Sequence, residues 1–330
     1  METTQTPNHH ATVPPPDEAP SVLVFPFPFP FLFARPAALI SNMFLGFTEA
    51  VAPSLSIPRL TFYPSGAYAP NGPIQPTSSS SVITVSDVPG APSFHFRHLS
   101  GLFKECMLSN VASHGSVFNS FADADGGYLM QLESLRWGGQ VWGVGPVHLL
   151  VENDTKGEDS VQVMEWLEGR EEGSVLYVCF GTMVRLNQDQ SRSPKGLKTS
   201  GAMFFWVMPD HWVLPSGLEE SLEGHGAVLR GCAPQAQVLQ HKAIGAFLTH
   251  YGWNSMLEGH AAGVGVGVGA LASEGEGSRR DPGLLAQAVA RVMEPGSTER
   301  LRARLMGEAA QRAMGPGRSS RAGLESLVER

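Results

Sequence analysis

The chain has 330 residues, which is long enough for two domains with separate hydrophobic cores. Its formal net charge of −8 argues against nucleic acids and anionic membrane surfaces as partners. The three cysteines, Cys106, Cys179 and Cys232, show no metal-ligand spacing, and their odd number and wide separation indicate a reducing compartment.

Residues 1–20 are polar and rich in proline, and we expect them to form a disordered leader. They carry Glu2, Asp17 and Glu18 but no Lys or Arg, so they do not resemble the start of a signal peptide. The apolar stretch Ser21–Phe33 is interrupted by prolines and is too short to span a bilayer. We therefore expect a soluble, cytoplasmic protein.

The rest of the first half alternates short apolar runs with helical patterns. Strands are expected at Val22–Phe25, Ala38–Phe44, Arg59–Phe62 and Ser116–Ser120, and helices at 46–55, Leu102–Leu108 and Gly126–Leu135. Residues 21–147 are therefore expected to form one α/β domain. A charged segment follows and marks residues 148–160 as a linker.

The second half shows the same alternation, so residues 161–330 are expected to form another α/β domain with a parallel sheet. Strands are expected at Val175–Phe180, Ala202–Val207 and Gly245–Thr249, and helices at Val161–Gly169, Leu284–Met293 and Glu299–Met314. The run Gly263–Gly269 has the glycine spacing of a dinucleotide-binding loop. Because it follows an expected helix rather than a strand, a low-complexity loop is the better interpretation.

The segment Gly231–Gly263, GCAPQAQVLQHKAIGAFLTHYGWNSMLEGHAAG, carries the densest group of candidate site residues. An apolar strand ends at His250, and a helix is expected to start at Asn254 or Ser255, which are both good N-cap residues. A helix N-terminus at the carboxyl end of a parallel strand offers N–H groups and a partial positive charge to a diphosphate. Glu258, one turn later, can accept hydrogen bonds from ribose hydroxyls.

The same residues also have a purely structural interpretation. Ser255 and Glu258 have the spacing of a capping box, which stabilises helices without any ligand. Trp253 can be a core residue, and a single histidine such as His250 is more often structural than functional. From the residues alone, a binding site and a capped helix remain equally open.

The segment resembles the C-terminal signature box of plant family 1 UDP-glycosyltransferases. The matching positions, with the family's spacing, are Ala233, Pro234, Gln235, Leu239, His241, Phe247, His250, Gly252, Trp253, Asn254, Ser255 and Glu258. Other stretches resemble further parts of the family in the same order, among them VLVFPFP, VWGVGPV and SVLYVCFGT. The resemblance implies a fold of GT-B type, with two Rossmann-like domains facing a cleft and an N-terminal domain that is incomplete here.

The resemblance also implies a role for each position of the box. His250, Trp253, Asn254 and Ser255 are expected at the UDP site, with Thr182 approaching the diphosphate from the other side. Glu258 is expected to hold the ribose, and Ala233 to pair with uracil through its backbone, with Gln235 nearby. Cys232 replaces the tryptophan that stacks on uracil, and stacking is worth roughly 1–3 kcal/mol per base. UDP-sugar is the implied donor substrate, with no metal and no other cofactor.

The catalytic half of the family pattern is missing at several positions. The family's general base is a histidine after the first strand, but this chain has no histidine between His10 and His95. Asn42 stands where the family has the aspartate that stabilises the charged histidine. The Asp-Gln pair that grips the sugar does not follow Gly263.

Two functions follow from these observations. One is transfer of a hexose from a UDP-sugar to a hydroxyl of a small plant metabolite, such as a flavonoid or other phenol, with inversion. The alternative is a UDP-binding remnant or a non-functional truncated product that transfers nothing. The expected partners are UDP or UDP-sugar and a small hydroxylated acceptor, and the chain is expected to be a monomer.

Overall fold

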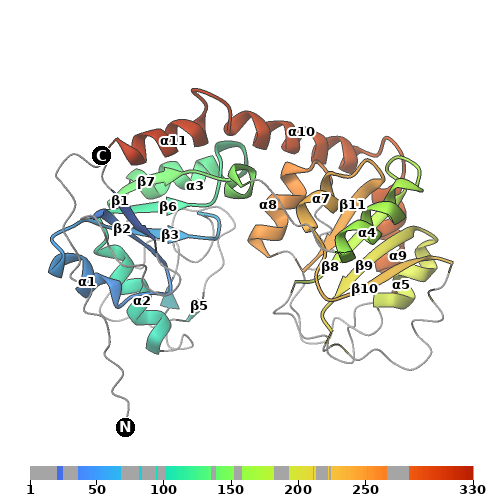
Figure 1. Cartoon of the computed structure of the whole chain (residues 1–330), viewed down its shortest axis with the longest axis horizontal. Helices are drawn as coiled ribbons and strands as arrows, with labels where there is room; N and C mark the ends of the chain where they lie inside the picture. Colours follow the sequence, from blue (N-terminus) through green and yellow to red (C-terminus); the bar gives the residue numbers. More distant parts are fainter. Residues whose placement is uncertain are drawn as a thin grey trace, which may run out of the picture. The chain divides into compact units, whose positions relative to one another are not determined.

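The structure is a computed structural model that divides into two compact units. The first comprises residues 1–119 and 125–143, and the second comprises residues 120–124 and 144–330. We call them the N-terminal and C-terminal units (Figure 1). The structure describes residues 21–24, 36–67, 82–83, 94–95, 101–134, 139–151, 158–181, 193–210, 212, 222, 224–250, 252–265 and 282–329. The expected disordered leader, residues 1–20, lies outside them.

The N-terminal unit contains a parallel sheet with the strand order β1-β2-β3-β6-β7. Its strands are β1 Ser21–Val24, β2 Pro36–Asn42, β3 Arg59–Tyr63, β6 Gly115–Phe118 and β7 Gln140–Gly143. The helices along this part of the chain are α1 Thr48–Ser54, α2 Gly101–Val111 and α3 Ala122–Ser134. A separate antiparallel pair joins β4 Val82–Ile83 to β5 Phe94–His95.

Spatial neighbours in this sheet follow the order of the chain, so its strand order never reverses within the described residues. A complete Rossmann-like sheet places its first strand centrally, and its ligand crevice forms where the strand order reverses. The described sheet therefore lacks the feature that normally creates the crevice, as expected for an incomplete N-terminal domain.

The interior of the N-terminal unit holds a buried arginine. Arg59 on β3 is 3% exposed. Its guanidinium donates to Thr48 Oγ1 at 2.8 Å, to Ser109 O at 2.9 Å and to Ser113 Oγ at 3.0 Å. It also donates to Asn110 Oδ1 at 3.0 Å. The cation thus ties β3 to α1, to α2 and to the turn after α2 through neutral acceptors.

The C-terminal unit is built on a second parallel sheet, with the order β10-β9-β8-β11. Its strands are β8 Val175–Cys179, β9 Met203–Met208, β10 Gly226–Arg230 and β11 Ile244–Thr249. Its helices are the short 3-10 helix η2 Val147–Leu150, α4 Glu158–Glu168, α5 Ser193–Ser200, α7 Gln235–Gln240, α8 Trp253–Ala261, α9 Pro282–Met293, α10 Thr298–Ala313 and α11 Ser319–Val328. Here the order does reverse, between β8 and β11.

Both faces of this second sheet are covered, because its strands are apolar on both sides. Leu176 and Trp206 pack on one face together with Leu285 of α9. Tyr177 and Phe247 pack in a second cluster with residues of α4 and α7. Figure 1 shows α4 and α7 on one side of this sheet and α5 and α9 on the other. The sheet is therefore the middle layer of an α/β/α sandwich, and the predicted α/β class is confirmed.

One expectation for this unit needs correction. The run after Gly263 was expected to be a loop, but Val264 is buried and its carbonyl accepts from Phe247 N–H at 3.0 Å. Gly265 forms a parallel bridge with Phe247, so the run begins by extending the sheet beside β11. Residues 266–269 lie outside the described residues.

Along the described chain, no helix combines the length and apolar character needed to cross a bilayer.

Candidate functional site

The candidate site lies at the reversal point of the C-terminal sheet. β8 and β11 are parallel neighbours, with Cys179 paired to Thr249 at their carboxyl ends. The loop after β8 begins at Phe180, and the loop after β11 leads through His250 into α8. In open α/β sheets, ligands bind outside the carboxyl ends of the strands at such a point.

Two glycines leave the space that the imidazole ring of His250 occupies. Gly181 has φ +72°, and a Cβ there would lie 2.9 Å from His250 Cε1. Gly252 has an ordinary backbone conformation, φ −63° and ψ 143°, but a Cβ there would overlap His250 Nε2. Gly252 was expected to provide a turn. Its backbone conformation is open to any residue, so glycine is needed here to make room for the His250 ring and not to form a turn.

The protonation of His250 follows from its surroundings. Partial burial lowers the pKa of His250 below its usual value of 6.5. The ring is therefore neutral at pH 7, with one nitrogen protonated. Its Nδ1 lies 3.3 Å from Thr249 Oγ1. If that hydroxyl donates to Nδ1, Nε2 carries the proton and can donate it to an anionic oxygen.

The start of α8 differs from the prediction. The N-cap is Gly252, with no side-chain capping bond, and the first helical residue is Trp253. Asn254 and Ser255 are therefore the second and third residues of the helix, and Ser255 with Glu258 does not form a capping box. The helix starts two residues early because Gly252 O already accepts from Met256 N–H at 2.9 Å. The capping-box interpretation is therefore wrong, whereas the alternative that Trp253 is a packing residue is supported, because Trp253 packs against Leu257 and Ala261.

Glu258 belongs to a partly buried polar relay, formed by Tyr177, Gln235 and Glu258. Gln235, the first residue of α7, donates through Nε2 to Glu258 Oε2. Tyr177 OH lies 3.3 Å from Gln235 Oε1 and donates to it. The ring of Tyr177 stacks on Phe247 at 5.0 Å and is completely buried. Gln235 and Glu258, which are 23 residues apart, are thereby brought into contact.

The other predicted nucleotide positions are distributed around this relay. Cys232 is exposed on the loop after β10, and Ala233 packs at the edge of the cluster that contains Tyr177. Thr182 lies outside the described residues, although its neighbour Gly181 contacts the His250 ring.

Asn42, at the position of the catalytic aspartate, has a structural task in the N-terminal unit. It is the last residue of β2, and its Oδ1 accepts from Phe44 N–H at 3.0 Å. Its backbone carbonyl accepts from Leu45 N–H at 2.9 Å. The side chain therefore forms an Asx-type turn that ends the strand. Phe44, predicted inside the strand, falls in this turn.

Two residues near the site were missed by the sequence analysis. Tyr177 lies within an apolar strand pattern, which predicts core and gives no sign of a polar task. His148, in η2, fell in the predicted linker. Burial lowers the pKa of His148, and the nearby carboxylate of Glu258 partly opposes that shift. The proximity of His148 to Glu258 has no signal in the sequence, because 110 positions separate them.

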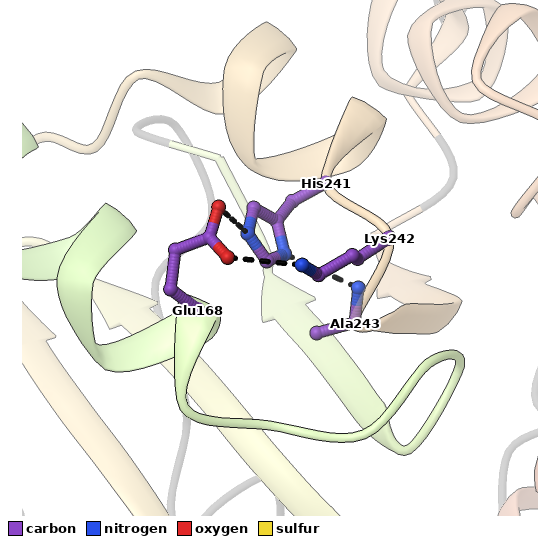
Figure 2. Close-up of polar contacts among 4 residues, drawn as sticks. All are labelled: Glu168, His241, Lys242 and Ala243. Carbon is purple, nitrogen blue, oxygen red and sulfur yellow. Dashed lines mark hydrogen bonds and ion pairs between the residues drawn. The ribbon is translucent and has the colours of Figure 1, made fainter.

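His241, another residue of the box, has a structural role (Figure 2). Its Nδ1 accepts from Ala243 N–H at 3.1 Å, so the proton is on Nε2. Nε2 lies 3.3 Å from Glu168 Oε1, without good hydrogen-bond alignment. Lys242 Nζ donates to Glu168 Oε2 at 3.0 Å, and this bond, with a smaller contribution from His241, lowers the pKa of Glu168. The group fastens α4 to the turn before β11.

Comparison with known proteins identifies the family. Residues 151–272 match the protein-family model described as "UDP-glucoronosyl and UDP-glucosyl transferase". The chain is 32% identical over 323 residues to flavonol 3-O-glucosyltransferase UGT89B1 of Arabidopsis thaliana, covering 81% of this chain and 67% of that protein. The chain belongs to the plant family 1 UDP-glycosyltransferases.

Solved structures of this family share the fold. Arabidopsis thaliana UGT89C1 has a TM-score of 0.70 and 28% identity, over 89% of this chain and 72% of that one. Glycyrrhiza uralensis UGT73P12, solved with glycyrrhetinic acid 3-O-monoglucuronide, has a TM-score of 0.72 and 25% identity, over 89% and 73%. Both support the GT-B assignment. UGT89C1 has also been solved with quercetin and with UDP-L-rhamnose.

The chain is shorter than its relatives. It spans 67% of UGT89B1, and 54% and 56% of the next two curated relatives. Family membership therefore leaves the activity of this chain to be argued from its own residues.

Proposed function

We propose that the C-terminal unit binds the UDP part of a UDP-sugar, and that the chain transfers the hexose to a hydroxyl of a small plant metabolite with inversion. The observation that carries the proposal is the convergence of His250, the start of α8 and the Gln235–Glu258 pair near one reversal point of the sheet. These groups provide donors for a diphosphate and acceptors for a ribose.

On the donor side, the chemistry follows from charge. When the bond between the sugar and UDP breaks, negative charge develops on the diphosphate. A neutral His250 can donate one hydrogen bond to it, and the N-terminus of α8 adds its partial positive charge. Fixed donors of this kind stabilise the leaving group more in the transition state than in the ground state. We propose no metal for this step.

The proposed acceptor is a phenol. UGT89B1 is named for flavonol 3-O-glucosylation, and UGT89C1 binds quercetin in its solved complex. Asn42 cannot supply the negative charge that a histidine base needs beside it. An acceptor of low pKa, which is partly ionised before it binds, would depend least on such a base. We therefore propose that an acidic phenol is the best acceptor.

A second candidate function is nucleotide binding without transfer. The observation that favours it is Asn42, whose Oδ1 is engaged in the turn after β2 and cannot act as a carboxylate. The two candidates share the UDP site and differ only in transfer.

Two experiments test both candidates. Isothermal titration of the full chain with UDP measures the shared site, and an absence of heat at millimolar UDP overturns both candidates. Incubation with UDP-glucose and phenols of graded pKa then measures transfer. Product formation that is strongest for the most acidic phenol and is abolished in His250→Ala supports the enzyme. Binding of UDP without any product supports the nucleotide-binding function alone.

A further inference from the structure

The hydrogen bonds that join Tyr177, Gln235 and Glu258 all run in one direction, from the tyrosine hydroxyl toward the carboxylate. An ionised carboxylate only accepts hydrogen bonds, so the group of Gln235 that faces Glu258 must be its NH₂. The amide oxygen of Gln235 is then fixed toward Tyr177, whose hydroxyl must be the donor. The positions of the amide oxygen and nitrogen of Gln235 are therefore fixed by its two partners, whereas for most side-chain amides the two orientations are hard to tell apart.

Tyr177 is a rigid end for this relay. Its ring lies between Phe247, at 5.0 Å and 17° between ring planes, and Phe205, at 6.1 Å and 15°. The side chain is 0% exposed, and its hydroxyl also contacts the thiol of Cys179 on the same strand. A tyrosine held on both faces within a packed core cannot adjust to a ligand. Its hydroxyl therefore fixes where Gln235 can lie.

We propose that Tyr177 is a positioning residue for ribose recognition, acting through the amide of Gln235 on the carboxylate of Glu258. The proposal rests on the proposed function, since it assumes that a nucleotide ribose meets Glu258. Gln235 occupies Oε2 of Glu258, which leaves Oε1 as the acceptor for a ribose hydroxyl. The relay thereby selects a ribonucleotide over a deoxyribonucleotide.

A phenyl ring at position 177 would pack against Phe247 and Phe205 as well as the tyrosine ring does. Tyr177→Phe keeps both stacked neighbours and the buried volume, and it removes only the hydroxyl. If the tyrosine served packing alone, this variant would bind nucleotides as the wild type does. If it positions Gln235, the amide can rotate and Glu258 loses its fixed orientation, so the contact to ribose weakens while the diphosphate contacts at α8 persist.

The test is titration of the full chain with UDP and with 2′-deoxy-UDP, which differ by one ribose hydroxyl. Wild type should prefer UDP. Tyr177→Phe should lose roughly two- to tenfold in UDP affinity, the range expected for one buried hydrogen bond, and much less for 2′-deoxy-UDP. The decisive readout is the dissociation constant for 2′-deoxy-UDP divided by that for UDP. A general loss of stability would weaken both affinities together and leave this ratio unchanged.

Two further variants complete the design. Tyr63→Phe removes the hydroxyl of a buried tyrosine in the N-terminal unit and should leave the ratio unchanged. Gln235→Ala should lower the ratio, and adding Tyr177→Phe to it should cost nothing more, because the relay is already broken. An unchanged ratio in Tyr177→Phe, or additive losses in the double variant, overturns the positioning role. Failure of the wild type to bind UDP overturns the proposed function itself.

Discussion

Gly252→Ala isolates the contribution of the His250 ring position to nucleotide binding. The backbone at Gly252, φ −63° and ψ 143°, accepts alanine without strain. The added Cβ would overlap His250 Nε2 and would lie 2.8 Å from Cε1. Non-bonded carbon atoms prefer about 3.5–4.0 Å, so the ring must move by roughly 0.7 Å or more.

The expected loss follows from that displacement. A hydrogen bond from His250 to a phosphate oxygen is one to a charged group, which is worth about 1.5–3 kcal/mol. Losing it would weaken UDP binding roughly ten- to hundredfold. Alanine is also a poorer N-cap than glycine, and this alone costs stability. Gly252→Ser separates the two effects, since serine caps well yet brings the same Cβ.

Isothermal titration with UDP is the assay, with thermal unfolding as a check on the fold. Both Gly252 variants should lose affinity, and neither should lose more when His250→Ala is already present. Gly127→Ala, on an exposed face of α3 with nothing within 4 Å of the new Cβ, is the matched control and should bind as wild type. If Gly252→Ser binds UDP normally, the ring is not held by this contact and the reasoning is wrong.

Three other outcomes are expected. Arg59→Met should destabilise the chain by about 2 kcal/mol or more in urea unfolding, because it removes the buried donors that Thr48, Ser113 and Asn110 share. A smaller loss would mean that the remaining partners of these groups, such as Ser41 and Thr61, satisfy them without the guanidinium. His241→Phe should cost about 1–3 kcal/mol through the lost acceptor for Ala243 N–H, and Glu168→Gln should cost less because that carboxylate is exposed. Burial lowers the pKa of three histidines, His148, His250 and His260, so the unfolded chain binds protons at these sites at a higher pH than the native chain. Stability should therefore fall as the pH drops below about 6.5, which urea midpoints at about pH 7.5 and 5.5 can measure, and an equal or higher midpoint at the acidic pH would contradict this.

The elements with a strong apolar run or a strong helical period were predictable from the sequence. β3, β8, β11, α9 and α10 lie within a few residues of their predicted ranges, because strand and helix periods are strong over such segments. The family resemblance, confirmed by the comparisons, supplied the GT-B fold. Other elements were missed, among them α7, whose six residues are too few for a helical period, and β10, whose sequence GAVLR is only partly buried and carries a weaker apolar pattern than β8 or β11.

The site was predictable as a set of positions but not as a set of contacts. The density of polar residues after β11 pointed to His250 and Glu258. It gave no sign that Gly252 accommodates a ring, or that Tyr177 reaches Gln235 across 58 positions. Such contacts depend on which strands become neighbours, and strand order is a property of the whole sheet. The predicted nucleotide roles and the cytoplasmic location remain predictions.

The order of the N-terminal sheet has a consequence for how the chain behaves in solution. Within the described residues, β1 pairs only with β2, so one side of its backbone faces no strand of the sheet. Its sequence, SVLV, is apolar in the manner of an interior strand and carries neither the charge nor the proline that natural edge strands use to prevent association. An uncharged strand margin is a template for strand addition by a second molecule. Within the described residues, the margin of β1 is therefore a place where a further strand could add, by backbone hydrogen bonds that need no matching side chains.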